Sequence, residues 1–120
     1  MRLILPAILC LGLAGALGAQ TATIDATDGN SVLGKLPCGA RLDALMVSCP
    51  FEYLAKPDDK ATLRVRLPIG TIRYIYLEDG MPVSTDSTDA LQSRLQGETL
   101  YIFVGEAERM EVPASLVSGG

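Results

Sequence analysis

The chain has 120 residues, with ten Lys or Arg, fourteen Asp or Glu, three Cys and no His or Trp, so its formal net charge is −4. This length suits one small domain with a single hydrophobic core. The absence of His excludes Ser-His-Asp and Cys-His catalysis and the usual zinc sites. The negative charge, without a run of Lys or Arg, argues against nucleic-acid binding.

Residues 1–19 have the composition of a signal peptide. Arg2 is their only charged residue, an apolar stretch follows it, and Gly18-Ala19 supplies the small residues needed near a cleavage site. A transmembrane anchor is the competing interpretation, but the apolar run is short for a bilayer span of about 20 residues. Cys10 lacks the small preceding residue that a lipoprotein requires. We therefore expect export to the periplasm, cleavage, and no stable membrane anchor after it.

The segment that follows, residues 20–36, is small, polar and Gly-containing, which predicts a flexible lead-in. After cleavage two cysteines remain, Cys38 and Cys49, and an even number in a small exported chain predicts one structural disulfide. A redox role is disfavoured because redox-active pairs normally form C-x-x-C, a much closer spacing. Apolar residues between the cysteines have helical spacing and indicate one helical turn there. Residues 37–120 are expected to form a single small β-rich domain.

From residue 51 onward polar and apolar residues alternate, which is typical of strands that bury one face. Residues 51–55 and 61–67 are predicted to form a hairpin. Its predicted opposite pairs are Phe51 and Val65, Tyr53 and Leu63, Ala55 and Ala61, and Glu52 and Arg64.

Two further hairpins extend this meander. Residues 68–71 are expected to form a four-residue loop, and Asp79-Gly80 is the strongest signal for a type I′ turn. The predicted opposite pairs are Leu67 and Ile72, Val65 and Tyr74, Leu63 and Tyr76, Arg66 and Arg73, Tyr76 and Val83, Tyr74 and Thr85, and Arg73 and Asp86. The two tyrosines then lie in the core, and the charged residues share the other face. A one-residue slip would mix these faces, so the registers support one another.

The remaining segments complete the expected fold. Residues 87–97 are predicted to form a short helix, because they include a capping Ser, Leu91 and Leu95 on one helical face, and a closing Gly. Residues 99–104 are apolar on both faces, as in a central strand, and residues 109–112 are expected to pair back against them. The predicted fold class is mainly β: a small antiparallel β-meander with one short helix and one disulfide.

The charged face of the meander holds the candidate binding site, formed by Arg64, Arg66 and Arg73. Two guanidinium groups can hold a carboxylate or a phosphate, and Arg66 opposite Arg73 would be repulsive without a nearby anion. The alternative is a solvated face on which Glu52 screens Arg64 and Asp86 screens Arg73. We favour this alternative because exposed ion pairs are common and individually weak.

Glu106, Glu108 and Glu111 cluster around Arg109, and two carboxylates are the minimum for glycoside hydrolysis. That chemistry needs a cleft and a carboxyl with a raised pKa, and a turn beside a strand edge offers little cleft. We expect no catalytic residue, no cofactor, no metal site and no enzyme activity. A small hydrolase that uses Glu108 or Glu111 is the least favoured alternative.

Several short motifs occur in an order that resembles a known family. They are Cys38, Cys49-Pro50-Phe51, Leu67-Pro68-x-Gly70, Arg73, Glu78-Asp79-Gly80, Glu108-Arg109-x-x-x-Pro113 and Gly119-Gly120. Over residues 38–120 the chain is similar to an uncharacterised family of small exported (periplasmic) proteins from Gram-negative proteobacteria. Met110 departs from the family pattern, which usually has an aromatic residue after Glu-Arg. The resemblance implies a periplasmic location and the disulfide, and it implies no reaction or ligand.

The function expected from these features is a non-catalytic binding or interaction module of the cell envelope. Its expected partner is an envelope protein or glycan, and we expect no binding of nucleic acid. The alternative from another class is a proteinaceous inhibitor of an envelope-attacking enzyme such as lysozyme, because an acidic protein suits a cationic target. An open meander would also leave two strand edges for another chain to pair with.

Overall fold

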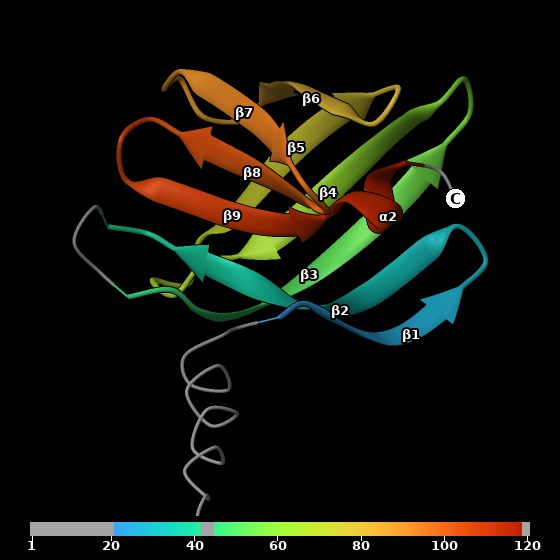
Figure 1. The fold of residues 1–120 in the computed structure, drawn as a ribbon, viewed down its shortest axis with the longest axis horizontal. Coiled ribbons are helices and arrows are strands. Elements are labelled where there is room, and N and C mark those ends of the chain that lie inside the picture. The colour runs from blue at the N-terminus through green and yellow to red at the C-terminus, as the bar shows by residue number, and fades with distance from the viewer. Residues whose placement is uncertain (1–20, 42–44, 119–120) are drawn as a thin grey trace, which may run out of the picture.

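The computed structural model describes residues 21–41 and 45–118, which form nine β-strands and one short helix (Figure 1). The elements are β1 Thr23–Asp28, β2 Ser31–Gly39, β3 Val47–Lys56, β4 Lys60–Arg66, β5 Ile72–Glu78, β6 Met81–Thr85, β7 Leu91–Gln96, β8 Thr99–Val104, β9 Glu108–Pro113 and α2 Ala114–Val117. The predicted signal peptide, part of the loop between the cysteines and the closing Gly-Gly motif lie outside the described residues.

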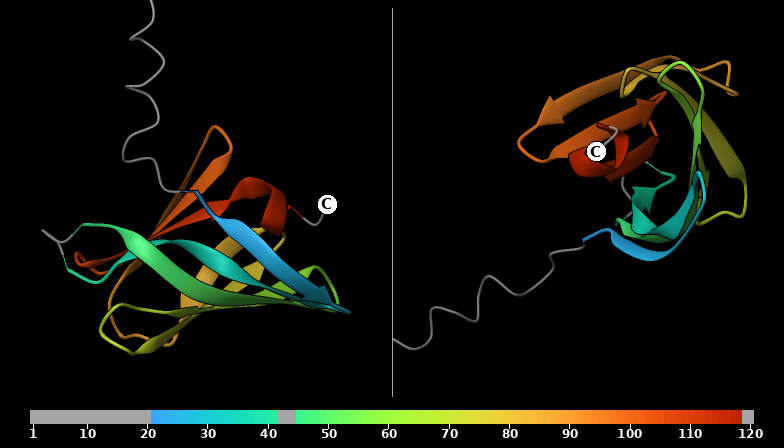
Figure 2. Two further views of the ribbon diagram at one scale, coloured as in Figure 1. Left: turned by 90° about the horizontal axis from the view of Figure 1, so that it is seen from below. Right: turned by 90° about the vertical axis from the view of Figure 1, so that its right-hand side faces the viewer.

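The strands form one antiparallel sheet in the order β6-β5-β4-β3-β2-β9-β8-β7, and β1 pairs with β2 as an extra strand. The sheet curls until its end strands, β6 and β7, lie side by side (Figure 2). We call the enclosed face of the sheet the inner face and the opposite one the outer face. The predicted mainly β fold, an antiparallel meander with one short helix, is confirmed.

One edge of β2 is shared by two strands, which brings the end of the chain back to its beginning. β1 pairs with residues 31–35, and β9 pairs with Cys38 and Gly39. Pro37 lies between these two ladders, and because it has no N–H it donates a hydrogen bond to neither of them. The return of β9 to β2 is what joins the two halves of the sheet.

The hydrophobic core lies on the inner face. Its side chains with a relative exposure of 2% or less come from β2 to β5, β8, β9 and the loop after β4: Leu36, Cys38, Cys49, Leu63, Val65, Leu67, Ile75, Leu77, Leu100, Ile102, Val104, Met110 and Val112. The predicted disulfide between Cys38 and Cys49 is confirmed, with its Cα atoms 5.9 Å apart. It joins β2 to β3 inside this core.

The predicted β3–β4 hairpin has the expected register. Tyr53 lies opposite Leu63, and Glu52 lies opposite Arg64, as do the other predicted pairs. Tyr53 and Leu63 are on the inner face, whereas Glu52 and Arg64 are on the outer face. The short turn and the strict alternation of both strands allow only one register that buries the apolar residues.

The predicted register of β4 with β5 is wrong by one residue. Arg66 lies opposite Ile72, and Val65 lies opposite Arg73. The cause is the loop, in which the N–H of Leu67 donates to the carbonyl of Thr71 at 2.8 Å. Three residues, 68–70, therefore make the turn, and Gly70 at φ +97° provides the left-handed position that such loops need.

This shift exchanges the two faces of β5. Ile75 and Leu77 fill the core, while Tyr74 and Tyr76, expected in the core, lie on the outer face. Both alternating sets of this strand contain large apolar side chains, so its pattern did not decide which set is buried.

The Asp79-Gly80 turn is confirmed, with φ +54° and +80° as a type I′ turn requires. Farther along β5 and β6 a bulge shifts the pairing, so that Tyr76 lies opposite Ser84 rather than Val83. A bulge adds one residue to one strand and reverses the faces beyond it. Val83, which the bulge leaves without a residue opposite it, is 52% exposed.

The helix predicted at residues 87–97 is wrong. Residues 91–96 of this segment form β7, which pairs with β8 along its whole length, and the helix found among the described residues is α2, after Pro113. Leu91 and Leu95 are four residues apart, a spacing that puts two side chains on one face of a strand as well as of a helix. The backbone N–H and C=O groups along the edge of β8 need hydrogen-bond partners, and this tertiary requirement makes residues 91–96 a strand rather than a helix.

Residues 20–36 were expected to be a flexible lead-in, but β1 and most of β2 lie within them. Gly29 at φ +60° makes the turn between these strands. Gly34 permits their close approach, because a Cβ atom there would lie 2.0 Å from the Thr23 carbonyl oxygen and 2.9 Å from the Phe51 ring. A sequence poor in apolar residues thus forms a hairpin that is anchored through β3.

Candidate functional site

The three candidate arginines do not form one site. Arg64 and Arg66 lie on the outer face of β4, and Arg73 lies on the inner face of β5. The expected opposition of Arg66 and Arg73 is wrong, because the register shift places Ile72 opposite Arg66. The candidate site therefore divides into an outer pair and an inner arginine.

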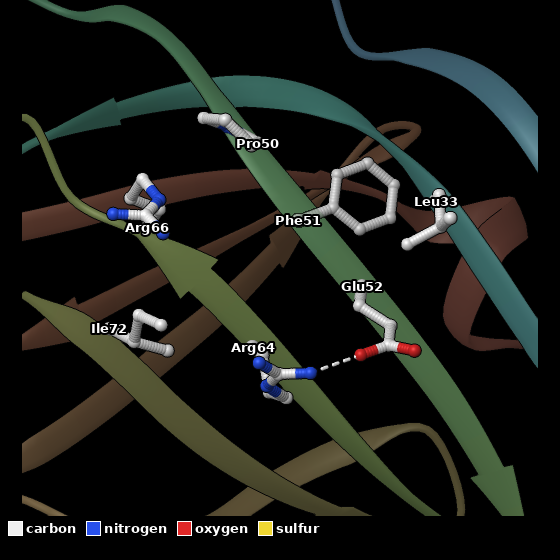
Figure 3. A pocket seen from close by; sticks show the side chains of 7 residues that line it. All are labelled: Leu33, Pro50, Phe51, Glu52, Arg64, Arg66 and Ile72. Carbon is white, nitrogen blue, oxygen red and sulfur yellow. Dashed lines mark hydrogen bonds and ion pairs between the residues drawn. The ribbon is translucent and has the colours of Figure 1, made fainter.

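The outer pair lines a shallow cavity of about 200 Å³ on β2 to β5, which we call the outer groove (Figure 3). Its lining residues are Leu33, Pro50, Phe51, Glu52, Arg64, Arg66 and Ile72. The groove combines two guanidinium groups with apolar side chains. This mixture suits a partner that presents an anionic group beside an apolar one.

Arg64 is held in place by its neighbours. Its guanidinium forms an ion pair with Glu52, which also accepts a hydrogen bond of 2.9 Å from the Ser31 hydroxyl. The guanidinium lies over the Tyr74 ring, 5.7 Å from the ring centre. Its Nε is buried and has no hydrogen-bond partner among the described residues. Arg64 therefore contributes a fixed, partly neutralised charge to the groove.

Arg66 has a different environment. It lies between Pro50 of β3 and Ile72 of β5, two apolar residues (Figure 3). Within residues 21–41 and 45–118 no carboxylate pairs with it, and its side chain is exposed. Its five N–H donors are free to bind a carboxylate or phosphate in a bidentate manner. Arg66 is the one predicted site residue that the structure leaves available.

Arg73 has its charge neutralised by two carboxylates. Its Nε and Nη2 donate to the two Glu108 oxygens at 2.7 and 2.8 Å, and its Nη1 donates to Asp86 at 2.8 Å. The Arg73 and Glu108 side chains are only 14% and 15% exposed. The hydrogen bonds to Glu108 raise the pKa of Arg73 well above its ordinary value. This residue is structural. Its predicted ion pair with Asp86 is confirmed, although the bulge places Asp86 opposite Tyr74 rather than directly opposite Arg73.

Asp86 has a shifted pKa within the same cluster. Burial alone would raise the pKa of this carboxyl. Hydrogen bonds from the Arg73 guanidinium and from the Tyr74 backbone N–H, the latter 3.1 Å long, outweigh burial and lower the pKa. Asp86 is therefore charged at neutral pH and fixes the end of β6 to β5.

The four charged residues around the β8–β9 turn are divided between faces. Glu108 is on the inner face with Arg73, whereas Arg109 and Glu111 lie on the outer face, opposite Phe103 and Tyr101. Glycoside hydrolysis requires two carboxylates that act on one bond. Glu108 and Glu111 do not provide such a pair, because the strand directs them to opposite sides of the sheet.

A second outer surface, not predicted from the sequence, lies on β7 and β8. The Arg94 guanidinium lies 5.4 Å from the Tyr101 ring centre and 5.9 Å from that of Phe103. The assignment of residues 87–97 to a helix concealed this contact. Tyr74 and Tyr76 form a similar exposed aromatic surface beside Arg64, with stacked rings 6.5 Å apart. The signal for this surface in the sequence was the apolar side chains within residues 99–104 that point away from the core.

Comparison with known proteins found no family model that matches the chain, and no similar curated protein or solved structure. Over the described part of the chain, no helix is both long and apolar enough to cross a membrane.

Proposed function

We propose that this protein is an exported, non-catalytic binding module of the cell envelope, which uses the outer groove to hold an anionic group of an envelope protein or glycan. The observation that carries the proposal is the environment of Arg66. It is an exposed cation without a carboxylate partner among the described residues, beside a second, fixed cation and between apolar side chains. A bidentate anion would complete this arrangement.

Export is part of the same proposal. The predicted signal peptide of residues 1–19 and the disulfide between Cys38 and Cys49 support a periplasmic location, because disulfides persist in oxidising compartments. The resemblance to small exported proteobacterial proteins agrees with this location.

The neighbouring exposed side chains support a macromolecular partner. Leu33, which lines the groove, is 44% exposed, and the Tyr74–Tyr76 surface lies beside Arg64. Tyr and Arg are enriched among the residues that dominate binding energy at protein interfaces. A partner that covers these side chains would exclude water from the Arg66 contact and strengthen it.

The test is affinity capture with the mature, oxidised protein. Wild type, Arg66→Ala and Arg94→Ala are immobilised in parallel and exposed to envelope extract at low salt. Arg94 is the matched control, since it is an outer-face arginine whose removal changes the net charge equally. We expect a species that wild type and Arg94→Ala retain and that Arg66→Ala retains at about one tenth of that level or less, as for a lost charged contact.

Two results would contradict the assignment, one from this capture experiment and one from a separate assay of lysozyme turnover. Equal capture by all three proteins would place any binding outside the groove. Slowing of lysozyme turnover by wild type and by Arg66→Ala alike would favour the inhibitor alternative. Arg73 is not a suitable variant for this assay, because its loss would destabilise the fold.

A further inference from the structure

A larger cavity, of about 480 Å³, opens at the end of the curled sheet where α2 packs. We call it the end pocket; its lining residues are Tyr53, Ala55, Lys56, Asp59, Lys60, Asp79, Gly80, Val117 and Ser118. None of them lines the outer groove. The volume falls within the range of small-molecule sites, about 300–1,000 Å³.

Three segments that are distant in the sequence build a fixed rim around this pocket. The Asp79 N–H donates to the Asp59 carbonyl at 2.8 Å, which ties the β5–β6 turn to the β3–β4 turn. The end of α2 packs against Gly80, where a Cβ atom would lie 2.9 Å from the Val117 carbonyl oxygen. The pocket is therefore preformed.

Tyr53 provides a polar group inside the pocket. Its side chain comes from the inner face of β3 and is only 9% exposed. No hydrogen bond to its hydroxyl is found in the described part of the protein, and the oxygen is accessible from the pocket rather than sealed in the core. Burial raises the pKa of Tyr53, so at neutral pH the hydroxyl is protonated and can both donate and accept.

The rim adds donors and acceptors of both signs. Lys56, Asp59 and Asp79 form no ion pair with other described residues, and Lys60 makes only an exposed pair with Glu78 at 3.9 Å. The ammonium groups can only donate and the carboxylates can only accept. Asp58 and Asp59 are both left-handed, at φ +66° and +58°, a conformation that Asp tolerates in tight turns.

This set of groups selects one kind of ligand. Lysines and aspartates balance in charge, which disfavours a simple anion or cation, and the polar rim disfavours a lipid chain. Sugar hydroxyls both donate and accept, so each can bridge a carboxylate and an ammonium. The apolar parts of Tyr53, Ala55 and Val117 can contact the C–H face of a sugar ring. We infer that the end pocket binds a neutral saccharide of one or two sugar units, with Tyr53 and the Asp79 carboxylate as its main hydrogen-bonding groups.

The experiment is a titration followed by ¹H–¹⁵N NMR with the oxidised protein. The probes are N-acetylglucosamine, glucose and cellobiose, with the dipeptide Ala-Ala and inorganic phosphate as charged comparisons. The variants are Tyr53→Phe and Asp79→Asn, and Tyr76→Phe is the matched control on the outer face. Asn suits a type I′ turn, so Asp79→Asn removes the charge and keeps the backbone.

We expect at least one saccharide to shift the amide resonances of Tyr53, Lys56 and Val117. Its affinity should fall about fivefold to tenfold in Tyr53→Phe and Asp79→Asn, as for one lost hydrogen bond, and stay unchanged in Tyr76→Phe. The thermal stability of Tyr53→Phe should equal that of wild type, because its hydroxyl has no described protein partner.

Three results would overturn the inference. They are no saccharide-dependent shifts at millimolar concentration, equal saccharide affinity in wild type and both pocket variants, and shifts at these residues with the dipeptide or phosphate alone. Failure of this site would leave the outer groove proposal untouched, since the two share no residue.

Discussion

Three arginines on two adjacent strands have three different roles because their neighbours differ. Arg64 lies between a carboxylate and an aromatic ring, Arg66 lies between apolar residues, and Arg73 is enclosed with Glu108 and Asp86. Residue type alone gives all three the same charge and the same donors. The cross-strand neighbours decide which one is structural and which one is available to a partner.

At this scale we predict an acid-sensitive contribution from Asp86. Its pKa is lower in the folded protein than its unfolded value of about 3.9. The stabilisation it provides is therefore complete above about pH 5, where the unfolded carboxyl is also ionised, and is lost as the pH falls through the lower, folded pKa. Urea denaturation of wild type and Asp86→Asn across acidic pH should show a difference in free energy of unfolding that shrinks toward low pH. A constant difference would contradict this linkage.

At the scale of elements, the β1–β2 hairpin depends on a glycine more than on its apolar residues. All residues of β1 are exposed, and among the described strands β1 pairs only with β2. Gly34 lets the β1 backbone and the Phe51 ring approach β2 from its inner side. The fixed position of β1 depends on this close contact, because β1 itself buries little apolar area.

We predict that Gly34→Ala destabilises the protein by about 1–3 kcal/mol, as overpacking does when backbone must move. Hydrogen exchange should then show loss of protection at the amides that join β1 to β2. Lys35→Ala is the control at the next position. It removes only an exposed ion pair with Asp25 and should cost less than about 1 kcal/mol. Equal effects of both substitutions would refute the packing argument.

At the scale of the whole molecule, one ion pair spans the interior. Arg73 belongs to β5 and Glu108 to β9, two strands that are four places apart in the sheet order. Their contact is possible only because the sheet curls. The pair therefore ties the two halves of the sheet together at the end opposite α2, while β2 joins them through its hydrogen bonds to β9.

We predict that Arg73→Ala lowers the free energy of unfolding by about 3 kcal/mol, since it leaves the Glu108 carboxylate poorly solvated and unpaired. The double variant Arg73→Leu with Glu108→Leu should recover most of that loss, because no lone charge remains. Lys60→Ala, which breaks the exposed pair with Glu78, should change stability by less than about 0.5 kcal/mol. An Arg73→Ala effect as small as that of Lys60→Ala would show that the cross-sheet pair is not structural.

The candidate site could be predicted from the sequence only in part. The pairing of Glu52 with Arg64 followed from the β3–β4 turn. Arg73 and Asp86 were predicted to lie directly opposite each other, but the β5–β6 bulge places Asp86 opposite Tyr74, from where its carboxylate still reaches Arg73. The Arg73–Glu108 pair could not be predicted, because 35 residues separate the two in sequence. The end pocket depends on two turns and α2 meeting in space, a juxtaposition that no local pattern encodes.

By itself the sequence determined the properties that depend on local chemistry: the mainly β class, the Asp79-Gly80 turn, the β3–β4 register and the Cys38–Cys49 disulfide. Only the tertiary structure decided which face of β5 is buried, that residues 91–96 form a strand, and that the meander curls. Leu91 and Leu95 satisfy a helix and a strand equally, and β5 has apolar residues on both faces. Where local preferences are balanced in this way, the need to pair exposed strand edges and fill a common core decides the result.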